Sequence, residues 1–158
     1  MSENLGTYLN DHVAGSVLAL ELLDHLIDLP EAPDRKLLTR LRIEIQEDQE
    51  VLQQLLRTVG AKESTVRKAA AWLTEKLGRA KLRMDDSGSG ELRVLEGLES
   101  LALGIQGKLA LWRSLATLGD AVPPLKTLDL ARLQARAVEQ FESVERLRLQ
   151  AARRTLSS

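Results

Sequence analysis

Cysteine is absent from this 158-residue chain, and histidine and aromatic residues are scarce. Without cysteine the chain can form no disulfide, no thiolate metal site and no cysteine nucleophile. The two histidines, His12 and His25, are too few for a zinc site with three histidine ligands. Because aromatic residues make up only 3% of the chain, its core must be built from leucine, alanine, valine and isoleucine.

Net charge and hydropathy argue against further classes of protein. The formal net charge is −1, which is not typical of a general nucleic-acid-binding protein. The longest apolar stretch, residues 13–29, is interrupted by Glu21, Asp24 and Asp28, so we do not expect it to span a membrane. The N-terminal sequence MSENLG has no basic region, and we therefore expect no signal peptide and a cytoplasmic location.

Apolar residues recur at spacings of three and four along most of the chain, a pattern typical of helices and unlike strands. Glycine and proline interrupt this pattern at a few places. We therefore predict a single all-α domain over residues 1–158, with Asp34 as a helix N-cap and Gly60 just past a helix end. The predicted helices are four long ones, over residues 3–29, 34–59, 91–118 and 127–155, and a short one over 64–83.

The connections between these helices predict how they pack. Short turns join the first two long helices and the last two, so each pair is expected to form an antiparallel hairpin. The link between the hairpins has about 30 residues and a short helix of its own, enough to run the length of a bundle. That would leave the helices over 34–59 and 91–118 parallel. One long crossover between two hairpins is the topology of ferritin-like four-helix bundles.

Two stretches of the chain carry a resemblance to a known family. They are YLNDHVAGS at residues 8–16 and GIQGKLALW at residues 104–112. With its topology, the chain resembles ferritin-like proteins, and in particular bacterial helical proteins related to the stress-associated YciE/YciF-type group. The resemblance implies metal ligands at the centre of the bundle, with Fe or Mn as the cofactor, and a role in the stress response.

Carboxylates at core-facing positions are the candidate ligands. Asp48 falls inside the apolar stripe of its helix and Glu44 at the margin, where a carboxylate must be paired, protonated or bound to a metal. The register of the first hairpin brings His12 within about one turn of Asp48, as a buried pair or a shared ligand. With the two hairpins packed as above, the candidate carboxylates are expected to converge near mid-bundle: Glu44, Asp48, Glu99 and Glu145.

These positions also depart from a ferritin-like di-iron site. Such a site takes a Glu-x-x-His pair from each of two helices, whereas the helices over 34–59 and 127–155 contain no histidine. A carboxylate-only site for a hard cation stays an alternative. We favour salt bridges in place of the metal, because arginines fall beside the carboxylates. The expected buried polar network is formed by Arg113 and Gln106, which extend a ladder from Glu99, and by Arg148 and Gln134.

The link between the hairpins is strongly basic. Residues 61–84 carry seven basic and two acidic residues, whereas residues 1–60 carry five basic and eleven acidic ones. The basic patch of this link is Lys76, Arg79, Lys81 and Arg83. We favour its packing against the acidic hairpin of its own or a second subunit. Binding to nucleic acid, an anionic lipid surface or an acidic partner is the other interpretation.

The leading hypothesis is a non-catalytic structural or interaction protein, with no bound cofactor and a metal site replaced by salt bridges. Trp72, Trp112 and a broad apolar surface on the first helix suggest extra burial, either under the short helix of the link or in a homodimer, and we favour the homodimer. The alternative is a carboxylate-ligated Fe or Mn protein with oxidase or stress-related chemistry. A third hypothesis is a protein that binds partners through the basic patch.

Overall fold

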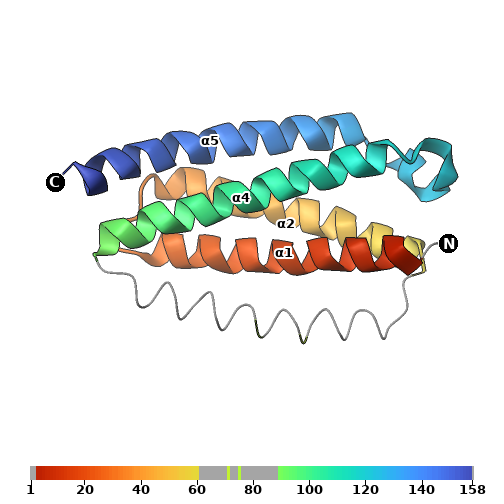
Figure 1. The fold of residues 1–158 in the computed structure, drawn as a ribbon, viewed down its shortest axis with the longest axis horizontal. Helices are drawn as coiled ribbons and strands as arrows, with labels where there is room; N and C mark the ends of the chain where they lie inside the picture. The colour runs from red at the N-terminus through yellow and green to blue at the C-terminus, as the bar shows by residue number, and fades with distance from the viewer. Residues whose placement is uncertain (1–2, 61–70, 72–74, 76–88, 158) are drawn as a thin grey trace.

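The computed structural model describes residues 3–60, 71, 75 and 89–157 (Figure 1). These residues form four long helices and no strand: α1 (Glu3–Asp28), α2 (Arg35–Thr58), α4 (Gly90–Ala116) and α5 (Leu130–Leu156). Two short 3-10 helices, η1 (Gly119–Ala121) and η2 (Pro123–Thr127), join α4 to α5. For the described residues, the prediction of an all-α fold with four long helices is confirmed, with helix ends displaced by at most about three residues.

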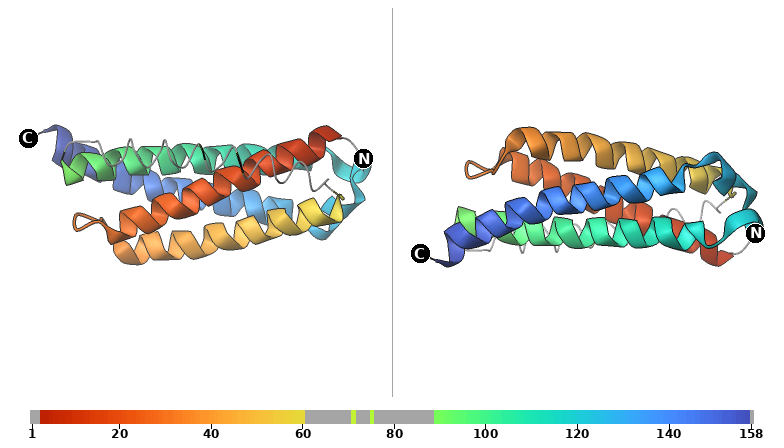
Figure 2. Two further views of the ribbon diagram at one scale, coloured as in Figure 1. Left: turned by 90° about the horizontal axis from the view of Figure 1, so that it is seen from below. Right: turned by 90° about the horizontal axis from the view of Figure 1, so that it is seen from above.

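The two helices of each hairpin are antiparallel, as predicted. The helices α2 and α4, which belong to different hairpins, run in the same direction, also as predicted. In Figures 1 and 2, α2 and α4 both end near the N-terminus of the chain, where α1 and α5 begin. The end of α2 and the start of α4 therefore lie at opposite ends of the bundle. The short helix expected over 64–83 and the basic patch fall outside the described residues, of which only Ala71 and Glu75 belong to this link.

Capping residues determine where the helices begin and end. Asp34 caps α2 as predicted, because its Oδ1 accepts a hydrogen bond from the Leu37 N–H at 3.0 Å. Gly60 follows the same helix with φ +68°, a left-handed conformation that glycine adopts without strain. Ser89 and Asp129 cap α4 and α5 in the same way. The Asp129 cap explains why α5 begins later than the apolar pattern alone suggests.

Apolar side chains fill the space between the helices in two separate clusters. The first is built around Leu23, Leu41, Leu98 and Val144, and the second around Trp112. Trp112 is fully buried in the second cluster, so its side chain is not available for contact with a second copy of the chain. No helix in the described ranges is long and apolar enough to cross a membrane.

Glycines mark how closely α1 approaches α4. At Gly97 the two helices are in tight contact, because a Cβ there would lie 2.8 Å from Cδ2 of Leu26. Farther along, a Cβ on Gly15, Gly104 or Gly107 would meet nothing within 4 Å. Space between α1 and α4 therefore remains near the middle of the bundle, beside the residues described next.

Candidate functional site

A polar side chain interrupts the apolar stripe of each long helix at the junction of the two core clusters. We call these four residues the polar layer: Ser16 on α1, Asp48 on α2, Lys108 on α4 and Gln140 on α5. Asp48 and Gln140 are only 2% and 1% exposed, and Ser16 and Lys108 are half-buried. Polar groups so deep in a bundle must find partners, because an unpaired buried group costs free energy.

The Asp48 carboxylate is held by two cations that come from two different helices. The Nζ of Lys108 lies 2.5 Å from Oδ2, and the guanidinium of Arg136 donates to Oδ1. Arg136 also donates to Oε2 of Glu47 at 2.8 Å, nearer the surface. These ion pairs offset the loss of hydration that burial imposes on the Asp48 carboxylate.

Gln140 connects the same lysine to a second carboxylate. Its Oε1 accepts a hydrogen bond from Nζ of Lys108, and its Nε2 donates to Glu44 at 3.0 Å. Both ends of the buried amide are therefore satisfied, and two of the three Lys108 donors are in use. The contacts join α2, α4 and α5 at one level of the bundle. On the α1 side, Gln49 donates to Ser16 at 2.9 Å.

Burial and opposite charges act against each other on the two cations. Burial lowers the pKa of Lys108, and the neighbouring charge of Asp48 opposes this effect without cancelling it. Burial also acts to lower the pKa of Arg136. There the hydrogen bond and charge of Asp48, followed by those of Glu47, outweigh burial and leave the pKa raised. Of the two cations bound to Asp48, Lys108 is therefore the one whose charged form the fold disfavours.

Arg148 organises a second, more exposed group of charges. Its Nη2 donates to Oε1 of Glu145 at 2.6 Å, and its Nη1 lies 3.4 Å from Oε1 of Glu99. The contact with Glu99 joins α5 to α4. The pKa of Glu145 is lowered by its hydrogen bond from Arg148.

The candidate metal ligands therefore divide between two places in the bundle. Glu44 and Asp48 belong to the level of Gln140, whereas Glu145 lies five residues farther along α5, a rise of about 7.5 Å. Within the described residues, no three carboxylate or histidine side chains come together as a metal would require. The expected convergence with Glu99 on one site is not found.

The donor set also fails to suit a ferritin-like metal centre. Both oxygens of Asp48 accept hydrogen bonds from cations, and Glu145 is held by Arg148. A metal at Asp48 would have to displace Lys108 or Arg136, and the displaced cation would repel it. The chemistry of this layer is that of a salt-bridge network.

His12 takes a different partner from the one predicted. The expected His12–Asp48 pair is not formed, and the hydrogen bonds that Asp48 accepts come from Lys108 and Arg136. The His12 ring instead packs edge-on against Tyr8, with centroids 4.7 Å apart. Burial lowers the pKa of His12, partly opposed by the charge of Asp11.

The polar ladder on α4 lies outside the core. Gln106 and Arg113 are exposed, and Gln134 and Arg148 are half-buried, so these four residues do not form the buried network that the sequence suggested. The reason is the breadth of the apolar side of α4, which leaves several rotations of the helix open. The buried face is centred on a different set of residues: Leu98, Leu101, Ile105 and Trp112.

Sequence reasoning missed Lys108, Arg136 and Gln140. Two of them carry the same signal that identified Asp48, a polar residue at core spacing within an apolar stripe. Lys108 follows Ile105 by three residues and precedes Trp112 by four. Gln140 follows Ala137 by three residues and precedes Val144 by four. Arg136 has no such signal, because it reaches Asp48 from the margin of the buried face of α5.

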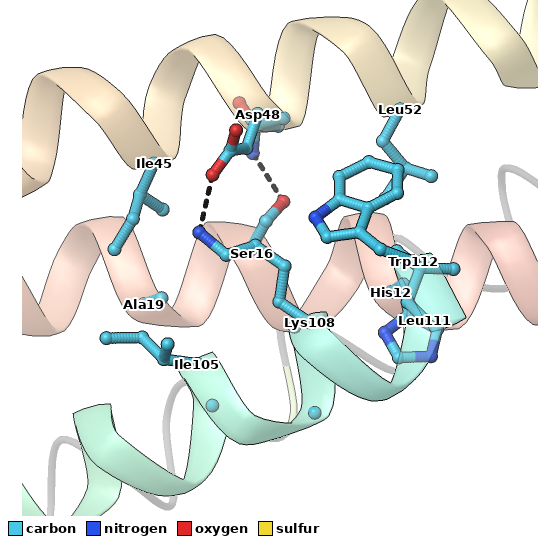
Figure 3. Close-up of a pocket in the computed structure, with 14 residues that line it drawn as sticks. His12, Ser16, Ala19, Ile45, Asp48, Leu52, Ile105, Lys108, Leu111 and Trp112 are labelled. Carbon is cyan, nitrogen blue, oxygen red and sulfur yellow. Dashed lines mark hydrogen bonds and ion pairs between the residues drawn. The ribbon is translucent and has the colours of Figure 1, made fainter. Parts of the chain in front are cut away.

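A cavity of about 200 Å³ lies beside the polar layer, between α1, α2 and α4 (Figure 3). Most of its wall is apolar and is formed by Ala19, Ile45, Leu52, Ile105 and Leu111. The polar residues in its lining are His12, Ser16, Asp48, Gln49 and Lys108. Gly15, Gly104 and Gly107 complete the lining.

Trp112 gives this cavity an unused hydrogen-bond donor. The side chain is 0% exposed, and its Nε1 has no hydrogen-bond partner in the part of the chain that the structure describes. In Figure 3 the indole nitrogen points into the space beside Ser16 and Lys108. A buried N–H without an acceptor is unusual and calls for an explanation.

Comparisons with known proteins found no match to this chain among family models, curated proteins or solved structures. What the site can do must therefore be argued from its own residues. Those residues offer a charge network and, next to it, a cavity lined by Trp112, whose buried N–H has no partner within the described ranges.

Proposed function

We propose that this protein is a non-enzymatic, ferritin-like helical bundle in which a salt-bridged polar layer stands in place of a metal centre. The observation that supports this proposal is the engagement of Asp48 by both Lys108 and Arg136. A carboxylate that already carries two cations is a poor ligand for a third positive charge.

The role of such a layer is to fix how the helices pair. Each partner of Asp48 comes from a different helix, so a slip of one turn by any of the three would strand a buried charge. A single buried polar residue sets register in the same way in coiled coils. The result is a bundle of defined register whose outer faces are available to partners, as a structural or interaction protein requires.

The partner that we propose is a second copy of this chain. Leu103 is 75% exposed on α4, and a second copy packed against this face would bury it. Light scattering after size exclusion would report the mass in solution, and a homodimer is expected. A monomer over the full micromolar range would contradict this part of the proposal.

The central test is metal content per chain, measured by plasma mass spectrometry on untagged protein from cells supplied with Fe, Mn and Zn. We expect far less than one metal per folded chain, unchanged in Glu99→Ala and Asp48→Asn. Stoichiometric Fe or Mn that is lost in either variant would overturn the proposal. It would favour instead a carboxylate-ligated protein with oxidase or stress-related chemistry.

The basic patch allows an equally direct test. On our proposal, anionic vesicles and duplex DNA bind weakly at physiological salt. Tight binding that weakens steeply with added salt, and that is lost on charge reversal of Lys76, Arg79 and Lys81, would show that this segment carries the function.

A further inference from the structure

We propose that the cavity between α1, α2 and α4 binds a small, uncharged and largely apolar molecule that carries one hydrogen-bond acceptor. Its volume is about 200 Å³. An apolar protein cavity of about 150 Å³ accommodates benzene, so this one suits a benzene ring with a short substituent.

We infer the hydrogen-bond acceptor on the ligand from Trp112. Its Nε1–H points into the cavity and finds no acceptor in the described part of the chain, although the side chain is fully buried. A ligand carbonyl or ring nitrogen placed there would satisfy the donor and recover the free energy that the unpaired group costs. The rest of the indole would pack against the apolar body of the ligand.

The charges around the cavity favour a neutral ligand. Asp48 and Lys108 both line it, but they neutralise each other at 2.5 Å. His12 also lines it, and burial there favours the neutral imidazole. An anionic ligand would find no cation without a carboxylate already attached to it, and it would lose its hydration on entry.

The shape of the wall favours an organic ligand over water. A buried water needs two to four polar partners, whereas most of the surface of this wall is apolar. Gly15, Gly104 and Gly107 belong to the lining, and a Cβ on any of them would meet nothing within 4 Å. A larger side chain can therefore be introduced at these positions without a clash at its Cβ.

The test follows the indole N–H of Trp112 by ¹H–¹⁵N correlation spectroscopy of the full chain. In Trp72→Phe this tryptophan is the only one, and if that variant does not fold, Trp112→Phe assigns the signal in the wild type. The probes are acetophenone, its apolar analogue isopropylbenzene, and benzoate. We expect acetophenone to move the Trp112 N–H signal downfield in a saturable way. Isopropylbenzene should bind without causing the downfield shift. Benzoate should bind at least about tenfold more weakly than acetophenone.

Two substitutions separate the cavity from the donor. Gly107→Leu should fill the space and abolish acetophenone binding, while circular dichroism and thermal unfolding report an intact bundle. Trp112→Phe keeps an aromatic wall and removes the donor, so acetophenone should bind about three- to tenfold more weakly while isopropylbenzene is little affected. Glu139→Gln, an exposed change on α5, is the matched control and should leave all probes unaffected.

Several outcomes would overturn the inference. They are the absence of any saturable shift up to millimolar probe, binding that survives Gly107→Leu, and tighter binding of benzoate than of acetophenone. None of these outcomes bears on metal content, so the inference and the proposed function can fail separately.

Discussion

Lys108 and Asp48 meet inside the bundle with Nζ 2.5 Å from Oδ2, although each belongs to a different helical hairpin. Residues within a hairpin are brought together by a short turn, whereas these two are separated by 60 positions and by the long link. Arg136 and Gln140 add three more contacts from the second hairpin to α2. The polar layer is therefore the place where specific hydrogen bonds determine how one hairpin sits on the other.

Removing Asp48 should destabilise the bundle strongly. In Asp48→Ala the two cations remain in place without their shared carboxylate, and a stranded buried charge typically costs about 3–5 kcal/mol. The free energy of unfolding from urea titrations, followed by circular dichroism, measures the loss.

The matched control for that experiment is Glu47→Ala, which removes the other carboxylate bonded to Arg136. The Glu47 side chain is 56% exposed, and an exposed ion pair contributes about 1 kcal/mol or less. Equal losses in Asp48→Ala and Glu47→Ala would show that Asp48 is not a buried anchor.

Replacing both charges together should cost less than removing one. Asp48→Leu alone strands Lys108, and Lys108→Met alone leaves Asp48 with Arg136 only. In the double variant an apolar pair fills the space and Arg136 keeps Glu47. A double-mutant cycle on urea unfolding should therefore give a favourable coupling of about 1–3 kcal/mol between the two positions. A coupling near zero would mean that the short Nζ–Oδ2 distance carries no net interaction.

The fold could be predicted because its signals are local and repeated. Apolar spacing, the Asp34 cap and Gly60 each act within a few residues, and together they determine where the helices lie. The relative directions of the helices followed from the lengths of the links between them. The end of α4 and the start of α5 were displaced because proline-rich 3-10 turns and the Asp129 cap compete with the helical pattern there.

The site could be predicted only in part, because partners across helices depend on rotation. Asp48 was found from its place in an apolar stripe, but its partners were not, since α4 is apolar around much of its circumference. Rotated to bury Leu98 and Ile105, α4 carries Lys108 inward and leaves Gln106 and Arg113 in solvent. A helical-wheel projection of a single helix cannot distinguish between such rotations, because the rotation depends on how the other helices pack against it.

Two glycines on α4 should respond oppositely to the same substitution. Gly104→Ala adds a methyl group where nothing lies within 4 Å, and alanine favours a helix over glycine by about 1 kcal/mol, so the bundle should be stabilised by roughly that amount. Gly97→Ala would place its Cβ 2.8 Å from Cδ2 of the fully buried Leu26, so the clash should cancel the helical gain or exceed it. Thermal unfolding of both variants checks the difference. Equal stabilisation would show that Leu26 can move aside freely.

His12 should make the stability of the bundle depend on pH in the mildly acidic range. Burial lowers its pKa in the folded chain, whereas in the unfolded chain the imidazole takes up a proton near its usual pKa of about 6.5. Between these two values the unfolded state binds more protons, so the free energy of unfolding must fall as the pH decreases and must level off once the folded state is also protonated. His12→Gln removes this term and leaves the contribution of the carboxylates.

Urea midpoints of the wild type and His12→Gln at pH 7.5 and pH 5.5 measure that difference. The wild type should lose more stability over this interval than the variant. Only in the wild type does the unfolded chain gain a proton at His12 that the folded chain does not bind. The same loss in both proteins would mean that His12 titrates alike in the folded and unfolded states. It would then have to be exposed in solution, in conflict with its edge-on contact with Tyr8 and its place at the cavity.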